Sequence, residues 1–339
     1  MRIAVIAPPW APIPPKLYGG IELVVDELAT GFQQAGHEVV LFATGDSASA
    51  VTTRWVLEQA EGHRIGAAVP ELRHVMNAYD AVGDFDVVHD HTIIGPVYSE
   101  RYPDVRVVTT VHGPFNEELA DIYRRIAERV PIIAISHAQR RHVADLRIAR
   151  VIHHGVDPHM FPVGAGDGGY FLFLGRMAPE KGAHRAVEAA RKAGVPLLVA
   201  AKMRESREVE YFDTLVKPSL NEDVVYLGEV EHEEKVRLLA GARALLNPIR
   251  WAEPFGLVMV ESLACGTPVL AFPEGAAPEI VEDGRTGFLC HDEVDMAERI
   301  GQVDQLDRTA CRASVTEYFN TTRMVNEHLA LFEDLICAH

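Results

Sequence analysis

The segment that decides the fold is residues 247–272, which read Asn247-Pro-Ile-Arg-Trp-Ala-Glu253-Pro-Phe-Gly256-Leu-Val-Met-Val-Glu261-Ser-Leu-Ala-Cys-Gly266-Thr-Pro268-Val-Leu-Ala-Phe272. An apolar strand is expected to end near Asn247, and a loop then carries Glu253. A helix should run from about Phe255 to Cys265, stop at Gly266 and lead into a second apolar strand. A strand, a helix and another strand in this order indicate a parallel α/β sheet.

Two glutamates stand at opposite ends of this expected helix. Glu253 lies just before the helix N-terminus, where free amides and the helix dipole favour anions. Glu261 follows eight residues later, which corresponds to about 12 Å along a helix. That distance exceeds the roughly 5–9.5 Å of a glycosidase acid–base pair. It suits two carboxylates that hold hydroxyls at the ends of a long ligand, with a diphosphate between them. The alternative is that both are solvated residues of an ordinary helix.

The same alternation of strands and helices continues on both sides of this segment. Short, nearly continuous apolar runs separated by helical stretches indicate parallel sheets covered on both faces. The runs expected as strands are 2–7, 39–44, 86–89, 106–111, 132–136 and 151–153, and then 170–174, 197–201, 224–227, 244–247, 269–272 and 287–290. Between the two sets, Pro158 to Gly169 hold four glycines and two prolines, which is typical of a linker.

These runs predict two Rossmann-like parallel-sheet domains of six strands each, facing across a cleft. We expect the first domain at residues 1–157 and the second at 158–319. A C-terminal helix at about 320–339 is expected to pack back on the first domain. In open parallel sheets ligands bind outside the carboxyl ends of the strands, so loops from both domains should surround one site.

Composition narrows the classes of function. The chain has 339 residues, of which 48% are hydrophobic, so two cores can be buried. Its formal net charge of −17 disfavours a nucleic-acid partner. No apolar run reaches the roughly 18 residues of a membrane span, and the N-terminal apolar stretch is too short for a secretory signal. The cysteines are scattered, which predicts reduced thiols in a cytoplasmic protein; they are Cys265, Cys290, Cys311 and Cys337.

Two further loops carry groups suited to phosphate. Phe173-Leu-Gly175-Arg176-Met-Ala-Pro-Glu180-Lys181-Gly182 follows an expected strand and opens a helix. Arg176 and Lys181 could neutralise a leaving diphosphate there, although an isolated pair would be surface charge. Near the N-terminus, the motif Tyr18-Gly19-Gly20-Ile21-Glu22 lets main-chain amides of Gly19 and Gly20 approach phosphate or sugar. It is not the GxGxxG dinucleotide fingerprint.

Histidines stand at the expected carboxyl ends of two strands. His112 lies in Thr109-Thr-Val-His112-Gly113, at the end of the fourth expected strand. It is either a satisfied core histidine or a ligand-facing group. His89-Asp90-His91 follows the third expected strand and invites a metal interpretation. Because no third ligand stands at convincing spacing, we favour a strand-end motif.

Taken together, these segments resemble the family 4 retaining glycosyltransferases, which have the GT-B fold. The resemblance rests on the E-x7-E pattern of Glu253 and Glu261 and on the G-R-x4-K-G pattern of Arg176 and Lys181. It extends to Tyr18–Glu22, Gly36-His-Glu-Val39, the T-x-H-G context of His112, Gly228-Glu-Val230, His154-Gly-Val-Asp157 and Gly275-Ala276-Ala-Pro-Glu-Ile280. At Ala276 the family has a second glycine, so we expect the methyl group to narrow the approach to the ligand.

The resemblance implies a retaining, metal-independent, hexosyltransferase-type enzyme with no cofactor. Its donor would be a nucleotide-diphosphate sugar, with a UDP-sugar favoured. His112 would contact the donor sugar, and Val230 would read the base through backbone groups. The resemblance assigns catalysis to His112, Arg176, Lys181 and Glu253, and donor binding to Gly19, Gly20, Val230, Phe255, Gly256, Leu257 and Glu261.

Other readings stay open at this point. A non-hydrolysing sugar-nucleotide epimerase would share the fold and the donor. A nicotinamide-dependent dehydrogenase would need a GxGxxG motif, which is missing. A non-catalytic module would bind the donor but never turn it over.

Residues 46–85 and 113–131 carry no motif that identifies the acceptor. We expect a small-molecule or oligosaccharide acceptor, from secondary-metabolite or glycoconjugate biosynthesis. A peripheral membrane contact through the basic stretch is less favoured than solvated helix faces; its arginines are Arg124, Arg125, Arg129, Arg140 and Arg141.

Overall fold

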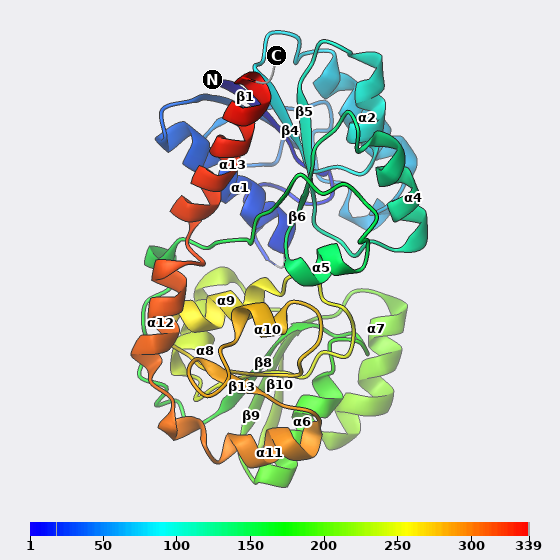
Figure 1. Cartoon of the computed structure of the whole chain (residues 1–339). Coiled ribbons are helices and arrows are strands. Elements are labelled where there is room, and N and C mark those ends of the chain that lie inside the picture. Colours follow the sequence, from blue (N-terminus) through cyan, green and yellow to red (C-terminus); the bar gives the residue numbers. More distant parts are fainter. Residues whose placement is uncertain (18, 338–339) are drawn as a thin grey trace. The chain divides into compact units, whose positions relative to one another are not determined.

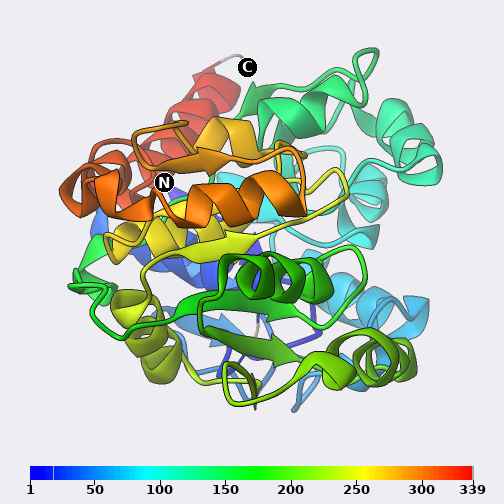
Figure 2. The same ribbon diagram turned by 90° about the horizontal axis from the view of Figure 1, so that it is seen from below.

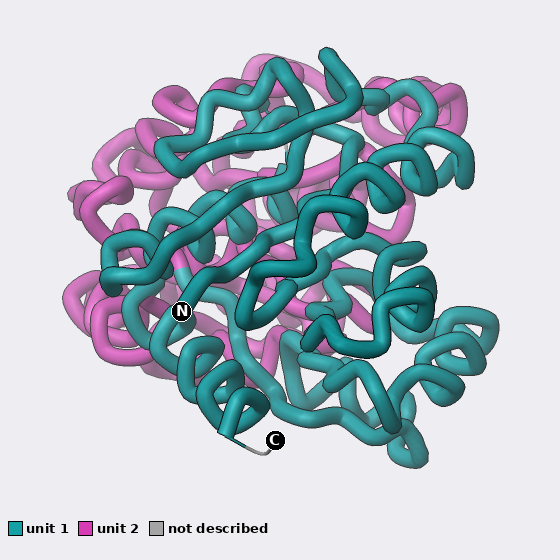
Figure 3. The backbone as a smooth tube through the Cα atoms, turned by 90° about the horizontal axis from the view of Figure 1, so that it is seen from above, with its two compact units in different colours: residues 1–155, 321–339 teal, residues 156–320 magenta. Residues whose placement is uncertain are grey.

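The computed structural model describes residues 1–17 and 19–337. The chain divides into two compact units. The first unit comprises Met1–Gly155 together with the C-terminal stretch from Thr321, and the second comprises Val156–Asn320. The N-terminal residues and the C-terminal helix, up to residue 337, both belong to the first unit (Figure 3). Each unit is an α/β layer structure of its own, and Figure 1 labels many of its helices and strands.

In the described residues, the first unit contains a seven-stranded parallel sheet in the order β3-β2-β1-β4-β5-β6-β7. Its strands are β1 (Arg2–Ile6), β2 (Glu38–Phe42), β3 (Thr52–Arg54), β4 (Val87–Asp90), β5 (Val107–Val111), β6 (Ile132–Ala134) and β7 (Arg150–Val151). Its helices are α1 (Gly20–Gln34), α2 (Ala68–Tyr79), α3 (Ile94–Tyr98), α4 (Glu117–Ile126), α5 (His137–Arg141) and α13 (Thr321–Cys337).

The second unit contains a six-stranded parallel sheet in the order β10-β9-β8-β11-β12-β13. Its strands are β8 (Phe171–Arg176), β9 (Leu197–Lys202), β10 (Val224–Gly228), β11 (Leu245–Asn247), β12 (Val269–Ala271) and β13 (Gly287–Leu289). Its helices are α6 (Ala183–Ala193), α7 (Ser206–Tyr211), α8 (His232–Gly241), α9 (Leu257–Ala264), α10 (Ala277–Ile280), α11 (Glu293–Ile300) and α12 (Arg308–Glu317). Figure 2 shows the green strands of this sheet among their flanking helices.

The predicted α/β architecture of two parallel sheets is confirmed, and one strand was missed. The prediction of six strands in the first half is wrong because β3 adds an edge strand beside β2. Its sequence, Thr52-Thr-Arg54, is polar and its two end residues are exposed. Short polar edge strands give no apolar run. The central strands, in contrast, are buried along nearly their whole length, as parallel sheets covered on both faces require.

Both sheets reverse their strand order beside their first strand. The reversal falls between β1 and β4 in the first unit and between β8 and β11 in the second. Crossovers leave β1 and β4 towards opposite sides, which opens a crevice at the carboxyl ends of these strands. The loops that follow β1, β4, β8 and β11 therefore occupy the positions where open α/β sheets bind ligands.

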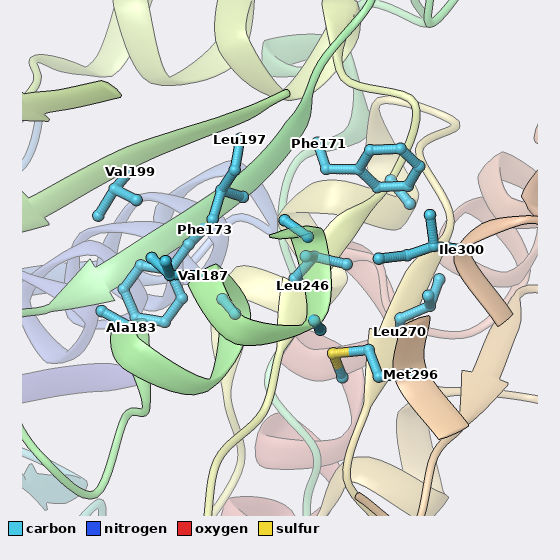
Figure 4. Packing of buried hydrophobic residues seen from close by; sticks show 14 of the residues in the cluster. Phe171, Phe173, Ala183, Val187, Leu197, Val199, Leu246, Leu270, Met296 and Ile300 are labelled. Atoms are coloured by element: carbon cyan, nitrogen blue, oxygen red, sulfur yellow. The ribbon is translucent and has the colours of Figure 1, made fainter. Parts of the chain in front are cut away.

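The core of the second unit supports the two strands, β8 and β11, from which the loops of that unit emerge. Phe171 and Phe173 on β8, with Leu246 on β11, are at most 2% exposed. They pack with Val187 of α6 and Met296 of α11, as Figure 4 shows. Burial of aromatic and aliphatic side chains of this size contributes about 1.5–3 kcal/mol each. The strands that deliver the loops are thereby rigidly placed.

The C-terminal helix α13 packs along α1 within the first unit. Phe332 meets Phe32 with ring centroids 5.4 Å apart. Thr321 donates a 2.7 Å hydrogen bond to the Glu27 carboxylate, and Arg150 lies 3.0 Å from the Asp334 carboxylate. Aromatic packing, a hydrogen bond and an ion pair thus hold α13 to the rest of the first unit.

The proline- and glycine-rich segment from Pro158 is hydrogen-bonded to the second unit. The amide of Gly164 donates to the carbonyl of Cys265 at 3.0 Å, and that of Gly168 to the carbonyl of Gly241 at 2.9 Å. Arg312 donates to the carbonyls of Phe161 and Pro158. The segment expected as a linker is therefore anchored along the second unit by its backbone.

Candidate active site

The loop that follows β8 carries two cations. Arg176 is the last residue of β8, and its guanidinium donates a 2.9 Å hydrogen bond to Glu180. Lys181 stands before α6, and its ammonium donates a 2.5 Å hydrogen bond to the Glu253 carboxylate. Only 14% of the Lys181 side chain and 13% of that of Glu253 is exposed. The structure thus brings the R-x4-K loop and the first glutamate of the E-x7-E pattern into direct contact.

A buried arginine that the sequence analysis missed ties this loop to the next one. Arg185, on α6, donates hydrogen bonds to the carbonyls of Pro179, Glu180 and Pro248 at 2.8–3.1 Å. Burial lowers the pKa of its guanidinium, yet three carbonyl acceptors compensate for much of the lost hydration. The loops after β8 and β11 are therefore locked together. Only its place four residues after Lys181, in the first turn of α6, could have indicated this role.

The turn at Gly275 and Ala276 packs against the backbone of Glu253 and holds it in place. Gly275 has φ +56, and a Cβ atom at that position would overlap the backbone of Glu253. The Ala276 amide donates a 3.0 Å hydrogen bond to the Glu253 carbonyl. Ala276 is fully buried at φ −85, so its methyl group points into the protein. The expectation that Ala276 narrows the approach to the ligand is therefore wrong.

Helix α9 begins at the carboxyl edge of the second sheet, immediately after this glutamate. Gly256 is its N-cap with φ +91, a left-handed conformation that favours glycine. The first amides of the helix, including that of Leu257, have no acceptor within the helix and favour an anion. Phe255 is 2% exposed, and its ring lies 6.2 Å from that of Phe319. Phe255 can therefore meet a ligand only through its backbone.

Glu261 lies further along α9 and is 5% exposed. Its carboxylate accepts a 2.6 Å hydrogen bond from the ammonium of Lys235 on α8. Lys235 was missed by the sequence analysis because nothing near it in sequence marks it as a partner. Both glutamates of the E-x7-E pattern are thus paired with a lysine.

A network of charges joins the ends of β8 and β10. Arg176 lies 3.7 Å from the buried carboxylate of Glu208. Glu208 also accepts a 2.7 Å hydrogen bond from the amide of Arg204. The Arg204 guanidinium then donates two hydrogen bonds of 2.8 Å to the Glu229 carboxylate. Val230 follows Glu229 directly and is partly exposed, so this network places it on the same edge as Arg176.

In the first unit, histidines surround His112, which follows β5. Its Nε2 lies 2.8 Å from Nδ1 of His91, and its Nδ1 lies 3.4 Å from Nε2 of His154. The rings of His112 and His154 are stacked, with centroids 5.2 Å apart. His89 extends the cluster, with its ring centroid 4.0 Å from that of His91 and 5.1 Å from that of His328 on α13.

These histidines are neutral at pH 7. Burial lowers the pKa of His112 to about 3 and that of His328 to about 4. Burial and neighbouring histidines lower the pKa values of His89, His91 and His154 well below 6.5. A neutral imidazole has one donor and one acceptor. The contact between Nδ1 of His112 and His154 is 3.4 Å, which is long for a hydrogen bond. A ligand hydroxyl could therefore replace His154 as the hydrogen-bond partner of Nδ1 more readily than it could replace His91 at Nε2.

The motif His89-Asp90-His91 has a structural explanation. The Asp90 carboxylate accepts hydrogen bonds from Tyr79 and Thr92 at 2.8–2.9 Å. Burial raises the pKa of Asp90 to about 7. Across residues 1–17 and 19–337, no group of three or more His, Cys, Asp or Glu side chains is placed to hold a metal ion.

Within the same residues, no helix is both long and apolar enough to cross a membrane.

The glycine motif after β1 lies at the start of α1. Gly19 is the N-cap and Gly20 the first residue of the helix, and Tyr18 lies outside the described residues. The candidate residues therefore fall into two groups. Arg176, Lys181, Val230, Glu253, Gly256, Leu257 and Glu261 share the carboxyl edge of the second sheet, whereas Gly19, Gly20 and His112 lie at the carboxyl edge of the first.

Two family descriptions match adjoining parts of the chain. "Glycosyltransferase Family 4" matches residues 18–159, and "Glycosyl transferases group 1" matches residues 159–310. The D-inositol 3-phosphate glycosyltransferase of Mycolicibacterium smegmatis is 34% identical over 292 residues, which cover 74% of this chain and 64% of that protein.

Solved structures agree with these matches. AviGT4, a glycosyltransferase involved in avilamycin A biosynthesis, has a TM-score of 0.77 at 25% identity, covering 100% of this chain and 98% of the other. HepE of Anabaena, in complex with UDP and glucose, has a TM-score of 0.78 at 20% identity, covering 98% and 100%. The predicted GT-B fold is confirmed. The chain belongs to the family 4 glycosyltransferases, which transfer a sugar from a nucleotide sugar.

Proposed function

We propose that this protein is a retaining, metal-independent hexosyltransferase that uses a UDP-sugar and a small-molecule or oligosaccharide acceptor. The observation that carries the proposal is the pairing of Lys181 with Glu253 beside the start of α9. It combines a cation for a diphosphate, a carboxylate for sugar hydroxyls and free helix amides at one edge of a sheet. HepE, whose crystals hold UDP and glucose, supports UDP as the donor nucleotide.

Donor binding would exchange the partners of the Lys181–Glu253 pair. A diphosphate carries more negative charge than one carboxylate, so it should draw Lys181 away from Glu253. Glu253 then becomes free to accept hydrogen bonds from the sugar. Arg176, held by Glu180 and Glu208, supplies the second cation for the leaving group. Binding of the phosphates thereby prepares the sugar site.

We propose front-face transfer for the chemical step. The bond between the anomeric carbon and the diphosphate oxygen breaks, and Arg176, Lys181 and the amides at Gly256 and Leu257 stabilise the negative charge. The departing oxygen takes the proton of the acceptor hydroxyl, whose oxygen bonds to the anomeric carbon on the same face. The anomeric configuration is then retained.

His112 contributes to transfer from the first unit. Its neutral ring can donate or accept one hydrogen bond at Nδ1 without the cost of removing a charge from water. His112→Ala should lower kcat for transfer by about 10-fold or more, while the Kd for UDP changes by less than about threefold. Equal losses in kcat and nucleotide affinity would remove His112 from the sugar-contacting role.

The acceptor is proposed from the relatives. One is named for D-inositol 3-phosphate and another for avilamycin A biosynthesis, which favours a small-molecule or oligosaccharide acceptor. A membrane contact through the basic stretch is not favoured because Arg124 and Arg125 are paired with Asp145 and Asp121 at 2.7 and 3.0 Å. We also propose a cytoplasmic location, since free cysteines such as Cys265 are buried inside the second unit.

The test is a product analysis with α-linked UDP-sugars. Nucleotide sugars are ranked by thermal shift, acceptors are screened by mass spectrometry, and the linkage of the product is determined by NMR. We expect an α-linked glycoside. A β-linked product would contradict retention. Epimerised donor formed without an acceptor would favour a sugar-nucleotide epimerase, and donor binding without any turnover would favour a binding module.

A further inference from the structure

Lys235 is buried beside the second glutamate of the site, and no motif points to it. It lies in the first turns of α8, which begins at His232 after β10. Its Nζ donates a 2.6 Å hydrogen bond to Oε1 of Glu261. The side chains are 20% and 6% exposed, respectively. Because α8 follows the carboxyl end of β10, the pair lies at the same edge of the sheet as Arg176 and Lys181. It joins α8, which carries Lys235, to α9, which carries Glu261.

Lys235 is the cation that neutralises Glu261. His232 is close to both, but burial and the Lys235 charge lower the pKa of its imidazole, so it is neutral at pH 7. Arg312, near the other end of α9, donates instead to the carbonyls of Phe161 and Ala264. Among the described residues, only Lys235 forms an ion pair with Glu261.

The pair leaves half of the carboxylate available. A carboxylate offers about four lone pairs on its two oxygens, and Lys235 occupies a position on Oε1. The residues that the structure describes donate no hydrogen bond to Oε2. A buried carboxylate without a cation loses hydration that nothing replaces. Lys235 supplies a cationic partner for Glu261 at 2.6 Å, while one oxygen remains open to hydroxyl donors.

Lys235 is itself held in place by aromatic packing. Its Nζ lies 5.9 Å from the ring centroid of Phe161. The ring of His232 meets Phe161 edge-on at 5.6 Å. A cation this close to a ring face is attracted by its electrons, so the ammonium has a fixed direction. Thr267, which follows α9, also donates a 2.6 Å hydrogen bond from its hydroxyl to the carbonyl of Leu239 on α8, so Lys235 is not the only link between the two segments.

We propose that Lys235 is a positioning residue for the donor ribose. Its hydrogen bond to Oε1 orients the Glu261 carboxylate, so that Oε2 accepts hydrogen bonds from the ribose 2′ and 3′ hydroxyls. This inference rests on the proposed function, because it assumes that a nucleotide donor binds at this edge. It assigns ribose recognition to a lysine–glutamate unit built from two helices, where the E-x7-E pattern supplies only one member.

The test compares nucleotides with and without the two ribose hydroxyls. UDP, GDP and ADP and their 2′,3′-dideoxy forms are titrated calorimetrically into the wild-type protein and into Lys235→Met. For the nucleotide that the wild-type protein prefers, Lys235→Met should lower the affinity for the ribo form by about 10-fold or more. The affinity for the dideoxy form should change by less than about threefold, so the preference for ribose collapses. Lys235→Arg should restore most of the preference, because it keeps the charge.

Two controls separate positioning from a loss of structure. Lys217→Met removes a lysine whose partner, Asp213, lies on the surface of the same unit, and it should leave all affinities unchanged. In a Glu261→Gln background, Lys235→Met should cause no further loss of ribose preference. If Lys235→Met keeps the wild-type preference, or weakens both forms equally, the positioning role is wrong. If wild type binds no nucleoside diphosphate at all, the proposed function itself fails.

Discussion

At the carboxyl edge of the first sheet the clustered polar groups are histidines, whereas at the same edge of the second sheet they are lysine–glutamate pairs. The first group, around His112, is neutral because burial lowers the imidazole pKa values. The second, with Lys181–Glu253 and Lys235–Glu261, consists of charges at 2.5 and 2.6 Å from one another. The strand order around the two edges is nevertheless the same.

This difference separates two kinds of ligand group. A diphosphate needs cations, and paired lysines supply them once the anion displaces the carboxylate. Neutral imidazoles cannot attract an anion in this way, but they can exchange single hydrogen bonds with hydroxyl groups. One topology therefore supports two chemistries, and the side chains at the strand ends decide which one each unit carries.

The largest expected effect comes from the charged edge. Lys181→Ala removes the cation that should stabilise the leaving diphosphate, and kcat should fall by at least ~100-fold. Initial rates with a saturating UDP-sugar measure this. As a matched control, Lys192→Ala removes a lysine whose partner is the surface carboxylate of Glu188, and its rate should be unchanged. Turnover within threefold of wild type in Lys181→Ala would remove Lys181 from catalysis.

A second large effect should follow from the turn that supports Glu253. Gly275→Ala places a methyl group against the Glu253 backbone at a positive φ, so the loop must move. Mispositioning of a catalytic group by about 1 Å costs on the order of 10²-fold in rate. Ala276→Gly alters the neighbouring residue, whose φ is −85, and should leave kcat within about threefold. Equal rates in the two variants would show that the turn does not position Glu253.

The neutral histidines of the first unit should make its stability depend on pH in the acidic range. The folded pKa values of His112, His328 and their neighbours lie below the ordinary 6.5, so below pH 6.5 the unfolded chain binds more protons. Stability is therefore full above pH 6.5 and falls as the pH decreases, by up to about 1.4 kcal/mol per pH unit for each histidine. Asp90, with its raised pKa of about 7, acts in the opposite direction and offsets about one of them.

The first unit should consequently lose more than about 3 kcal/mol of unfolding free energy between pH 7.5 and 5.5. Urea unfolding of Trp251→Phe measures it, because the remaining tryptophans, Trp10 and Trp55, both lie in the first unit. His328→Phe should reduce the pH dependence. A first unit equally stable at both pH values would contradict the neutral state of the cluster.

The sequence was sufficient for most of the fold. Apolar runs such as 132–136 and 197–201 mark buried parallel strands, and β6 and β9 fall on them. The misses have physical causes. β3 is short and polar, because an edge strand needs no apolar face. Helix α9 begins at Leu257, two residues after the expected start, because Gly256 adopts a left-handed conformation that a helix cannot include.

The site was only partly readable from the sequence. Local patterns marked Arg176, Lys181, Glu253 and Glu261, because each belongs to one strand–loop–helix segment. The groups that hold them were missed because their partners are distant in sequence: Lys235 lies 26 residues from Glu261, and Arg185 lies 63 residues from Pro248. Such pairs are set by strand order, which apolar periodicity does not reveal. The roles of these residues in catalysis stay predictions.

The most direct measurement is calorimetric titration of UDP and of the UDP-sugar into Glu253→Ala and Glu261→Ala. Glu261→Ala should weaken both ligands by about 10-fold or more, because both contain the ribose. Glu253→Ala should weaken only the UDP-sugar, and its affinity for free UDP should be retained or increased, because Lys181 is released from its carboxylate partner. That result would place the nucleotide and the sugar at opposite ends of α9. Equal loss of UDP affinity in both variants would contradict the account.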